Sequence, residues 1–310
     1  RVLRAAEIVL EDRMGQPILI GRRRVVEARA ARAGLKRVPH EVEVIDPEDD
    51  PRYRDYVDTY FSLVGRRGVT PEAARTAVRT NTTVIGALAV HMGDADTMIC
   101  GAEGGYQNHV DAVTNVIGLM PGVREPSALS LLLRDRDPIF LVDTQISHNP
   151  NGQDVAEMAL LAAEHIRTFG ITPRAALLSA SRFGSRDIPS ATLMREALEM
   201  LNRLAPELEV DGEMSGEEAM VEAVRARIMP DSPLTGTANL LVFPNIDAAH
   251  IAMTLIQAVT DALHVGPILL GLRQSVHITS QSATARGILN LSAIAVADAA
   301  ARRESLQAAG

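Results

Sequence analysis

A run of small hydroxyl residues, glycine and two arginines is the segment best suited to chemistry in this 310-residue chain. It reads Leu177-Leu-Ser-Ala-Ser-Arg-Phe-Gly-Ser-Arg186: an apolar strand runs into it, and Pro189 suits the first position of a following helix. Backbone N–H groups, hydroxyls and guanidinium groups in such a loop can converge on an anionic ligand. Ligands of open α/β sheets favour the carboxyl ends of strands. The residues alone leave a ligand loop and an ordinary connection equally open.

Three weaker patterns have ordinary structural interpretations. Gly101-Ala-Glu-Gly-Gly105 lies between a strand and a helix, where an anion cradle could form, but its spacing fits no dinucleotide fingerprint and the pattern favours a plain tight turn. His91, Asp94 and Asp96 are close in sequence, as they often are in solvent-facing connections, so no metal site is predicted. Cys100 ends an apolar strand and indicates an inert buried thiol.

Strand-like and helix-like segments alternate along the chain. Helical period is clearest from Gln153, with Val155, Met158, Ala159, Ala162, Ile166 and Phe169, and from Pro189, with Leu193, Met194, Ala197, Leu201 and Leu204. Alternation of this kind predicts an α/β fold, with mostly parallel sheets covered by helices on both faces. The predicted strands are Pro17–Ile20, Val42–Ile45, Thr97–Cys100, Ser127–Leu133, Ile139–Asp143, Ala175–Ser179, Asn239–Phe243 and Pro267–Leu270.

Two turn-rich or polar breaks predict the domain organisation. One is His148–Gly152, directly after a strand, and the other is Arg273–Gln281, before a final Ala-rich helix. We therefore expect residues 1–144 and 272–310 to form one lobe, with the helix near 284–303 packed against its N-terminal part. Residues 145–271 would form a second lobe, with a cleft between the two.

Composition excludes several classes of protein. Hydrophobic residues make up 46% and charged residues 23%, and the net charge is −8, which does not favour nucleic acid or an anionic membrane surface. One cysteine excludes an internal disulfide and fits a reducing compartment. No apolar run approaches the roughly 18 residues of a membrane span, and the first residues are no signal peptide. We expect a cytoplasmic protein.

The start lacks Met and lies within a plausible helix, so we interpret the chain as part of something longer, although removal of an initiator Met would give the same start.

Several motifs, taken together in order and spacing, resemble the phosphate acetyl/butyryltransferase family. They are Leu177–Ser185, Asp211-Gly-Glu-Met214, Met229-Pro-Asp-Ser-Pro-Leu234, Asn239-Leu-Leu-Val-Phe-Pro-Asn245 and Val265-Gly-Pro-Ile-Leu-Leu-Gly271. In detail they are similar to the version fused behind the malic enzyme module of long bacterial NADP-dependent malic enzymes. The resemblance covers essentially the whole chain. It implies a two-lobed fold like that of isocitrate and isopropylmalate dehydrogenases, a dimer through this domain, and CoA-type ligands.

The chain departs from that family where its chemistry resides. The resemblance aligns the family's Ser-Arg pair with Ser280 and Gln281, its base Asp with Gly287, and its phosphate-binding Arg with a position near Asp111. Gln supplies no cationic fork for acetyl phosphate, Asp111 would repel it, and Gly287 takes no proton. A loop shift could bring Arg286 into this space. We therefore predict no catalytic residues in this chain.

The resemblance and these losses together predict a regulatory domain that binds acetyl-CoA as an allosteric effector of a malic enzyme. The parent reaction, oxidative decarboxylation of malate to pyruvate with NADP and a divalent metal, would belong to an attached N-terminal portion, leaving this domain without cofactor or metal. The alternatives are an active phosphate acetyltransferase and a ligand-free dimerisation module. Expected partners are acetyl-CoA or CoA, a second copy and the attached portion, with no nucleic acid and no membrane. The residues predicted to bind acetyl-CoA are Ser179, Ser181, Arg182, Phe183, Gly184, Ser185, Arg186, Asn245, Ser280, Gln281 and Arg286.

Overall fold

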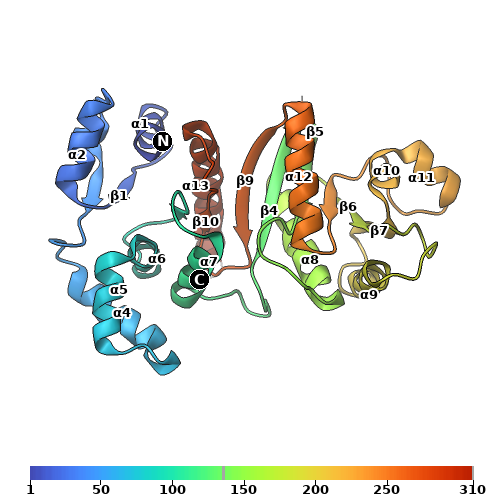
Figure 1. The fold of residues 1–310 in the computed structure, drawn as a ribbon, viewed down its shortest axis with the longest axis horizontal. Coiled ribbons are helices and arrows are strands. Elements are labelled where there is room, and N and C mark those ends of the chain that lie inside the picture. Colours follow the sequence, from blue (N-terminus) through green and yellow to red (C-terminus); the bar gives the residue numbers. More distant parts are fainter. Residues whose placement is uncertain (135–136, 309–310) are drawn as a thin grey trace. The chain divides into compact units, whose positions relative to one another are not determined.

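The chain folds into two compact units. A computed structural model describes residues 1–134 and 137–308. The first unit comprises Arg1–Met120 and Leu272–Gly310, and the second comprises Pro121–Gly271. Figure 1 shows the elements of both units in chain order.

A six-stranded sheet forms the centre of the second unit. Its strands lie in the order β7-β6-β8-β5-β4-β9, and β5, β6, β7 and β8 run parallel to their neighbours among themselves. β4 is antiparallel to both β5 and β9. The bounds are β4 Ser127–Arg134, β5 Asp137–Val142, β6 Arg174–Leu178, β7 Glu209–Met214, β8 Leu240–Val242 and β9 Leu263–Leu270.

Helices cover both faces of this sheet, because successive strand residues point to opposite sides. Phe140 stacks on Phe169, at the end of one helix, with ring centroids 6.0 Å apart. Its neighbour Leu141 instead joins a buried cluster with Ala249 and Met253 of another helix. The α/β prediction is confirmed. The helices of this unit are α8 Gly152–Thr168, α9 Pro189–Leu204, α10 Gly216–Met220, α11 Glu222–Ile228 and α12 Ile246–Thr260.

The two helices predicted from their period are present. Asn151 and Asp154 form a capping box at the start of α8, and Pro189 opens α9. The predicted apolar face of α8 is buried except at Phe169, the residue that follows the helix, which is 37% exposed. In α9 the prediction is wrong at one residue: Leu204 is 68% exposed, because it lies at the last position of the helix.

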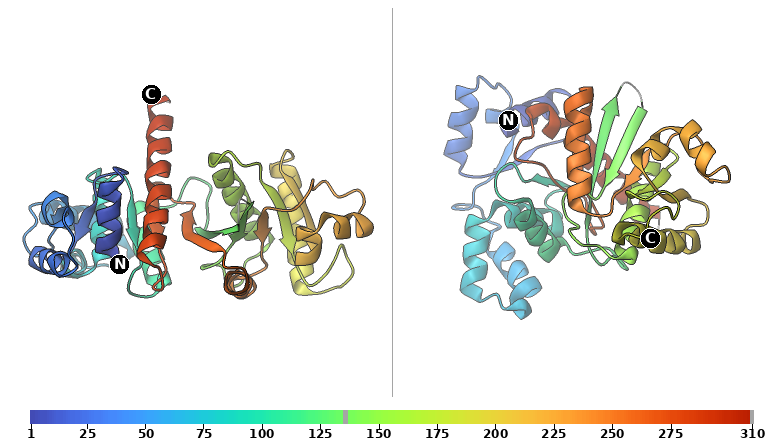
Figure 2. Two further views of the ribbon diagram at one scale, coloured as in Figure 1. Left: turned by 90° about the horizontal axis from the view of Figure 1, so that it is seen from above. Right: turned by 45° about the vertical axis from the view of Figure 1, so that its right-hand side comes forward.

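The first unit is mainly helical around two short parallel strand pairs, β1 with β2 and β3 with β10. Figures 1 and 2 show α1 beside the long α13, and α13 also packs on β3 and β10. The bounds are α1 Val2–Glu11, β1 Ile18–Ile20, α2 Arg23–Arg32, α3 Val38–Glu41, β2 Glu43–Ile45, α4 Tyr53–Val64, the 3-10 turn Gly65–Arg67, α5 Pro71–Thr80, α6 Thr82–Met92, β3 Met98–Cys100, α7 Tyr106–Ile117, β10 Val276–Ile278 and α13 Ala285–Ala308.

The first domain boundary differs from the one predicted. It falls between Met120 and Pro121 and not at 144/145, because β4 and β5 pair within the sheet of the second unit. The turn-rich segment after β5 is therefore a loop inside a domain. The chain passes back to the first unit between Gly271 and Leu272.

Sequence patterns missed two strands, β7 and β10. The sequence of β7, Glu209-Val-Asp-Gly-Glu-Met214, carries three acidic residues and a glycine, which are rare in strands. It forms an edge strand beside β6, and its carboxylates are bound by other segments of the unit. β10 is only three residues long and lies within the polar stretch that was interpreted as a break.

Candidate functional site

The loop between β6 and α9 closes around one buried carboxylate. Glu213 of β7 is 1% exposed. One of its oxygens accepts hydrogen bonds from the Ser181 hydroxyl at 2.7 Å and the Gly184 N–H at 2.9 Å, and lies 3.2 Å from the Arg195 guanidinium. Phe183 and Gly184 have positive φ, which turns the chain around the carboxylate. Burial opposes the charge, but these hydrogen bonds and Arg195 hold the Glu213 pKa below its usual value.

A second buried carboxylate pairs with Arg182, which follows Ser181 in this loop. It belongs to Glu218, which is fully buried and lies 3.2 Å from the Arg182 guanidinium. Its other oxygen accepts from the N–H of Ser215. At the start of the loop, the Ser179 hydroxyl lies 2.9 Å from that of Ser190 in α9. Most polar groups of the loop are thus already paired within the second unit.

This pairing limits which groups of the predicted acetyl-CoA site are free to bind a ligand. The N–H of Gly184 was expected to bind a ligand, but it donates to Glu213, and Ser181 is fully buried beside the same carboxylate. The Ser185 hydroxyl accepts from the N–H of Arg182. Within the described residues, the guanidinium of Arg186 has no hydrogen bond or ion pair, so it is the one exposed cation of this loop that is available.

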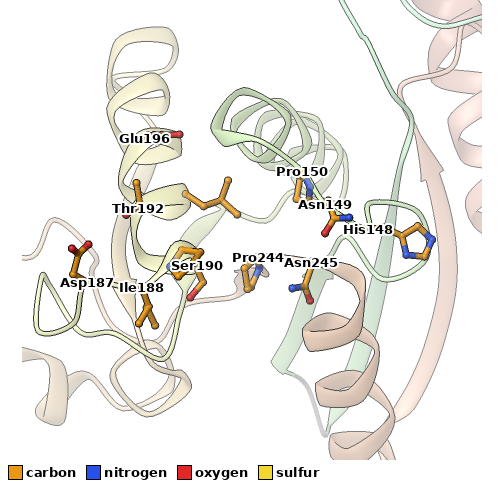
Figure 3. A pocket seen from close by; sticks show the side chains of 12 residues that line it. His148, Asn149, Pro150, Asp187, Ile188, Ser190, Thr192, Glu196, Pro244 and Asn245 are labelled. Atoms are coloured by element: carbon orange, nitrogen blue, oxygen red, sulfur yellow. The ribbon is translucent and has the colours of Figure 1, made fainter.

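A pocket of about 640 Å³ lies beside this loop, at the carboxyl ends of β5, β6 and β8. This is where open α/β sheets place ligands. Figure 3 shows Thr192 and Glu196 on one side, His148, Asn149 and Pro150 on the other, and Pro244 and Asn245 between them. The remaining lining residues are Asp187, Ile188, Pro189, Ser190 and Leu193.

The pocket is suited to neutral groups that form hydrogen bonds. The described residues that line it include two amides, two hydroxyls and several apolar side chains, but no Lys or Arg. Asp187 and Glu196 add negative charge. Phosphate groups would therefore have to bind outside it. Of the predicted site residues, only Asn245 lines this pocket, and its side chain also caps α12 by accepting from the N–H of Ala248 at 3.0 Å.

Sequence reasoning missed the loop that supplies His148, Asn149 and Pro150. Asp143, at the end of β5, organises this loop: its carboxylate accepts from the N–H groups of Gln145 and Ser147 at 2.8 and 3.0 Å. Burial of Asp143 raises its pKa. The sequence signal that indicates this loop is its position directly after a parallel strand. Its turn-rich sequence instead predicts a domain break there.

The other predicted residues, Ser280, Gln281 and Arg286, lie in the first unit. Gln281 donates its side-chain amide to the carbonyl of Gly104, within the glycine-rich turn after β3. Thus Gln281 is bound to its own chain. The Ser280 hydroxyl lies 3.1 Å from that of Ser282, and Arg286 is exposed and makes no side-chain hydrogen bond or ion pair among the described residues.

The glycine-rich turn itself has a packing role. Gly101 has a φ of +95°, and a Cβ there would lie 2.5 Å from the carbonyl oxygen of Thr279, next to β10. Asp111, in the helix that follows, accepts from the Gln107 amide at 2.8 Å. Close approach of β3 and β10 therefore explains this glycine without a ligand.

Three further features limit the chemistry of the chain. Burial raises the pKa of the Cys100 thiol to about 12, so almost none of it is thiolate at neutral pH. Across residues 1–134 and 137–308, no three His, Cys, Asp or Glu side chains gather in a group that could hold a metal ion. No described helix has both the length and the hydropathy needed to cross a bilayer.

Comparison with known proteins assigns the chain to a family. Residues 1–296 match the family described as phosphate acetyl/butaryl transferase, and the chain belongs to that family. An NAD-dependent malic enzyme of Rhizobium meliloti is 56% identical over 96% of this chain. The NADP-dependent malic enzyme of Escherichia coli is 44% identical over 96%. The chain spans only 39–40% of the length of these two enzymes.

Some phosphate acetyltransferases match along almost their whole length. The Bacillus subtilis enzyme is 31% identical, with 96% of this chain and 91% of that protein covered. The crystal structure of a phosphotransacetylase from Streptococcus pyogenes has a TM-score of 0.89 at 30% identity, covering 97% of this chain and 91% of that one. A 4-hydroxythreonine-4-phosphate dehydrogenase from Klebsiella pneumoniae, with a TM-score of 0.51 at 12% identity, shares the fold alone.

Proposed function

We propose that this chain is the regulatory phosphotransacetylase-like domain of a malic enzyme, and that it binds acetyl-CoA without transferring the acetyl group. The observation that carries the proposal is Gln281. It occupies the position that the family resemblance assigns to a catalytic Arg, and its amide is held by the carbonyl of Gly104. A neutral amide bound in this way supplies no cationic fork for a phosphoryl group.

The malic enzyme relatives support the regulatory part of the proposal. They match this chain over two fifths of their length, which leaves room for a separate catalytic portion. That portion would carry out the oxidative decarboxylation of malate to pyruvate, with its nicotinamide cofactor and a divalent metal. The matching relatives are named for both NAD and NADP, so the choice of nicotinamide cofactor belongs to that portion as well.

Ligand binding is proposed from two kinds of group. The pocket of the second unit offers amides, hydroxyls and apolar walls for the uncharged parts of acetyl-CoA. Its phosphates need cations, and Arg186 and Arg286 are exposed without a side-chain partner among the described residues. A charge-assisted contact from either would fix a phosphate group.

A catalytic assay tests the lost reaction. With acetyl phosphate and CoA, the chain should form no acetyl-CoA above background, whereas the Bacillus subtilis phosphate acetyltransferase serves as the positive control. Loss of one oriented charge-stabilising group typically costs about 10²–10³-fold in rate, and three such positions are changed here. A robust rate that disappears in Ser280→Ala would establish the alternative, an active acetyltransferase.

Titration calorimetry tests the effector. Acetyl-CoA should bind the isolated chain, and CoA lacking the acetyl group should show whether that group contributes. Absence of heat at millimolar acetyl-CoA would remove the regulatory proposal and leave a ligand-free assembly module. In the longer enzyme, a matching change in malate turnover on addition of acetyl-CoA would show that the two portions are coupled.

A further inference from the structure

Two histidines of the second unit, His250 of α12 and His264 of β9, are held by the same buried polar stretch. The Nε2 of His264 lies 3.2 Å from the hydroxyl of Ser130, which lies 2.9 Å from the hydroxyl of Thr144. The Nδ1 of His250 lies 3.4 Å from the carbonyl oxygen of Thr144. Ser130 and Thr144 are fully buried. Neither histidine lines the pocket described above, so this pair is a separate feature that links α12 to the sheet.

The hydrogen bonds of this stretch determine which nitrogen of each ring carries the proton. The Thr144 hydroxyl donates to the carbonyl of Ala128 at 3.2 Å, so the bond between Ser130 and Thr144 uses the proton of Ser130. Ser130 therefore accepts from the Nε2–H of His264. A carbonyl oxygen can only accept, so the Nδ1–H of His250 donates to it. In its neutral form each ring thus has one defined tautomer, and an added proton goes to the other nitrogen.

The surroundings of His264 oppose that added proton. Residues 127–133 of β4, the strand that pairs with β9, carry no charged side chain. Burial, together with the charge of His250, lowers the pKa of His264 below its ordinary value of 6.5. The charged or titratable groups that the structure describes on the adjacent elements are Asp247 and His250 of α12, Asp261 directly after it, Asp137 at the start of β5 and Asp143 directly after β5.

The unfavourable protonation acts on a helix that is only lightly buried. Two of the 15 residues of α12, Ala249 and Met253, are buried, against eight of the 17 residues of α8. Because the folded chain binds the His264 proton less readily than the unfolded chain does, stability falls as the pH drops below the ordinary His value of about 6.5. Like charges on the two rings would then repel α12 from β9. Segments with few buried contacts open first, so we expect the loss of stability to appear at α12.

We propose that His250 and His264 form a proton-sensitive attachment of α12 to the sheet, which holds the helix while both rings are neutral and loosens it when they are protonated. The supporting observations are the shared anchor at Thr144, the defined tautomers and the small buried face of the helix. The inference is independent of acetyl-CoA binding.

Hydrogen exchange followed by mass spectrometry at pH 7.5 and pH 5.5 tests this attachment. After correction for the intrinsic exchange rate, the protection of the α12 amides should fall about tenfold at the lower pH, as for one unit of difference in the pKa of a linked group. The α8 amides of the same unit should keep their protection. His264→Gln can still donate to Ser130 but does not titrate, so its α12 should lose little protection. His40→Gln changes an exposed histidine of the first unit and should respond as the wild type does.

A second variant keeps the test valid if His264→Gln does not fold. His250→Asn retains a donor for the Thr144 carbonyl and removes the neighbouring charge. Its α12 should lose less protection than that of the wild type, and NMR titration of the histidine rings should give His264 a higher pKa than in the wild type. A wild-type α12 that keeps its protection at pH 5.5 overturns the proposal. So does a loss shared equally by α8, or a loss in the folded variants as large as in the wild type.

Discussion

Two segments of this chain carry the residues expected to bind an anion. They differ in whether carboxylates of the chain itself already bind those residues. The loop Ser179–Arg186 of the second unit surrounds the buried carboxylate of Glu213, and its Arg182 is paired with Glu218. The segment 280–286 of the first unit holds no carboxylate of its own among the described residues, and Arg286 has no partner there. The loop Ser179–Arg186 thus contains more arginines and serines than segment 280–286, but fewer of its polar groups are free to bind a ligand.

The difference shows how a carboxylate from another strand changes the role of a loop. Hydroxyls, N–H groups and guanidinium groups that already donate to an internal carboxylate have fewer donors left for an external anion. Glu213 and Glu218 come from the segment after α9, more than twenty residues along the chain. They convert a loop that resembles a ligand site into a structural unit.

Removal of the Glu213 carboxylate is expected to have the largest effect, a loss of folding stability. Glu213→Ala leaves the Ser181 hydroxyl, the Gly184 N–H and Arg195 without their shared acceptor. We expect the free energy of unfolding to fall by about 3 kcal/mol, the cost of breaking buried charge-assisted hydrogen bonds. Urea denaturation measures it. Glu199→Ala, on the exposed side of α9, is the control and should change stability little. A loss in Glu213→Ala no greater than in this control would show that the loop does not depend on the carboxylate.

The pairing of the arginines in these two segments predicts which of them bind acetyl-CoA. Arg286→Ala and Arg186→Ala each remove an unpaired guanidinium, so we expect affinity to fall about tenfold or more, corresponding to roughly 1.5–3 kcal/mol. Arg182→Ala should lower affinity far less, because that guanidinium is committed to Glu218. Titration calorimetry on the three variants gives the order. If Arg182→Ala has the largest effect on affinity, the β6–α9 loop binds the ligand after all.

Acidification should weaken the same loop through Glu213. Its pKa is lowered in the folded chain from the ordinary value of 4.5, so the stability it contributes is present above that value and is lost as pH falls through the folded pKa. Glu213→Gln carries no titrating group there. Its stability should therefore decline less between pH 6 and pH 3 than that of the wild type, as measured by urea denaturation at each pH. Parallel curves would mean that other carboxylates dominate the acid response.

The smallest effect is expected in the first unit. Gln281→Ala removes one hydrogen bond, to the carbonyl of Gly104, from a solvent-exposed position. We expect a loss of about 1 kcal/mol or less in the free energy of unfolding. Thermal unfolding of Gln281→Ala and of Glu213→Ala, measured side by side, compares the contributions of the two segments to stability. A loss as large as that of Glu213→Ala would mean that segment 280–286 is as tightly built as the β6–α9 loop.

The sequence by itself determined the fold class and most of the elements. All eight predicted strands lie at β1–β6, β8 and β9, and α8 and α9 begin within one residue of their predicted starts. Local signals were sufficient there because hydrophobic period, capping residues and the position of Pro189 act within a few residues of one another. The family motifs, too, are short and local, so the family was recognised from them.

Only the tertiary structure decided which polar groups are free. The acidic strand β7 was missed because Asp211 and Glu213 are tolerated in the sheet only through partners from distant segments, such as Ser232 at 2.5 Å from Asp211. The pocket was missed in part because its walls come from loops after three strands that are neighbours in the sheet and far apart in sequence. Burial and pairing of charged groups depend on which segments the sheet order brings together, and that order is a property of the folded chain.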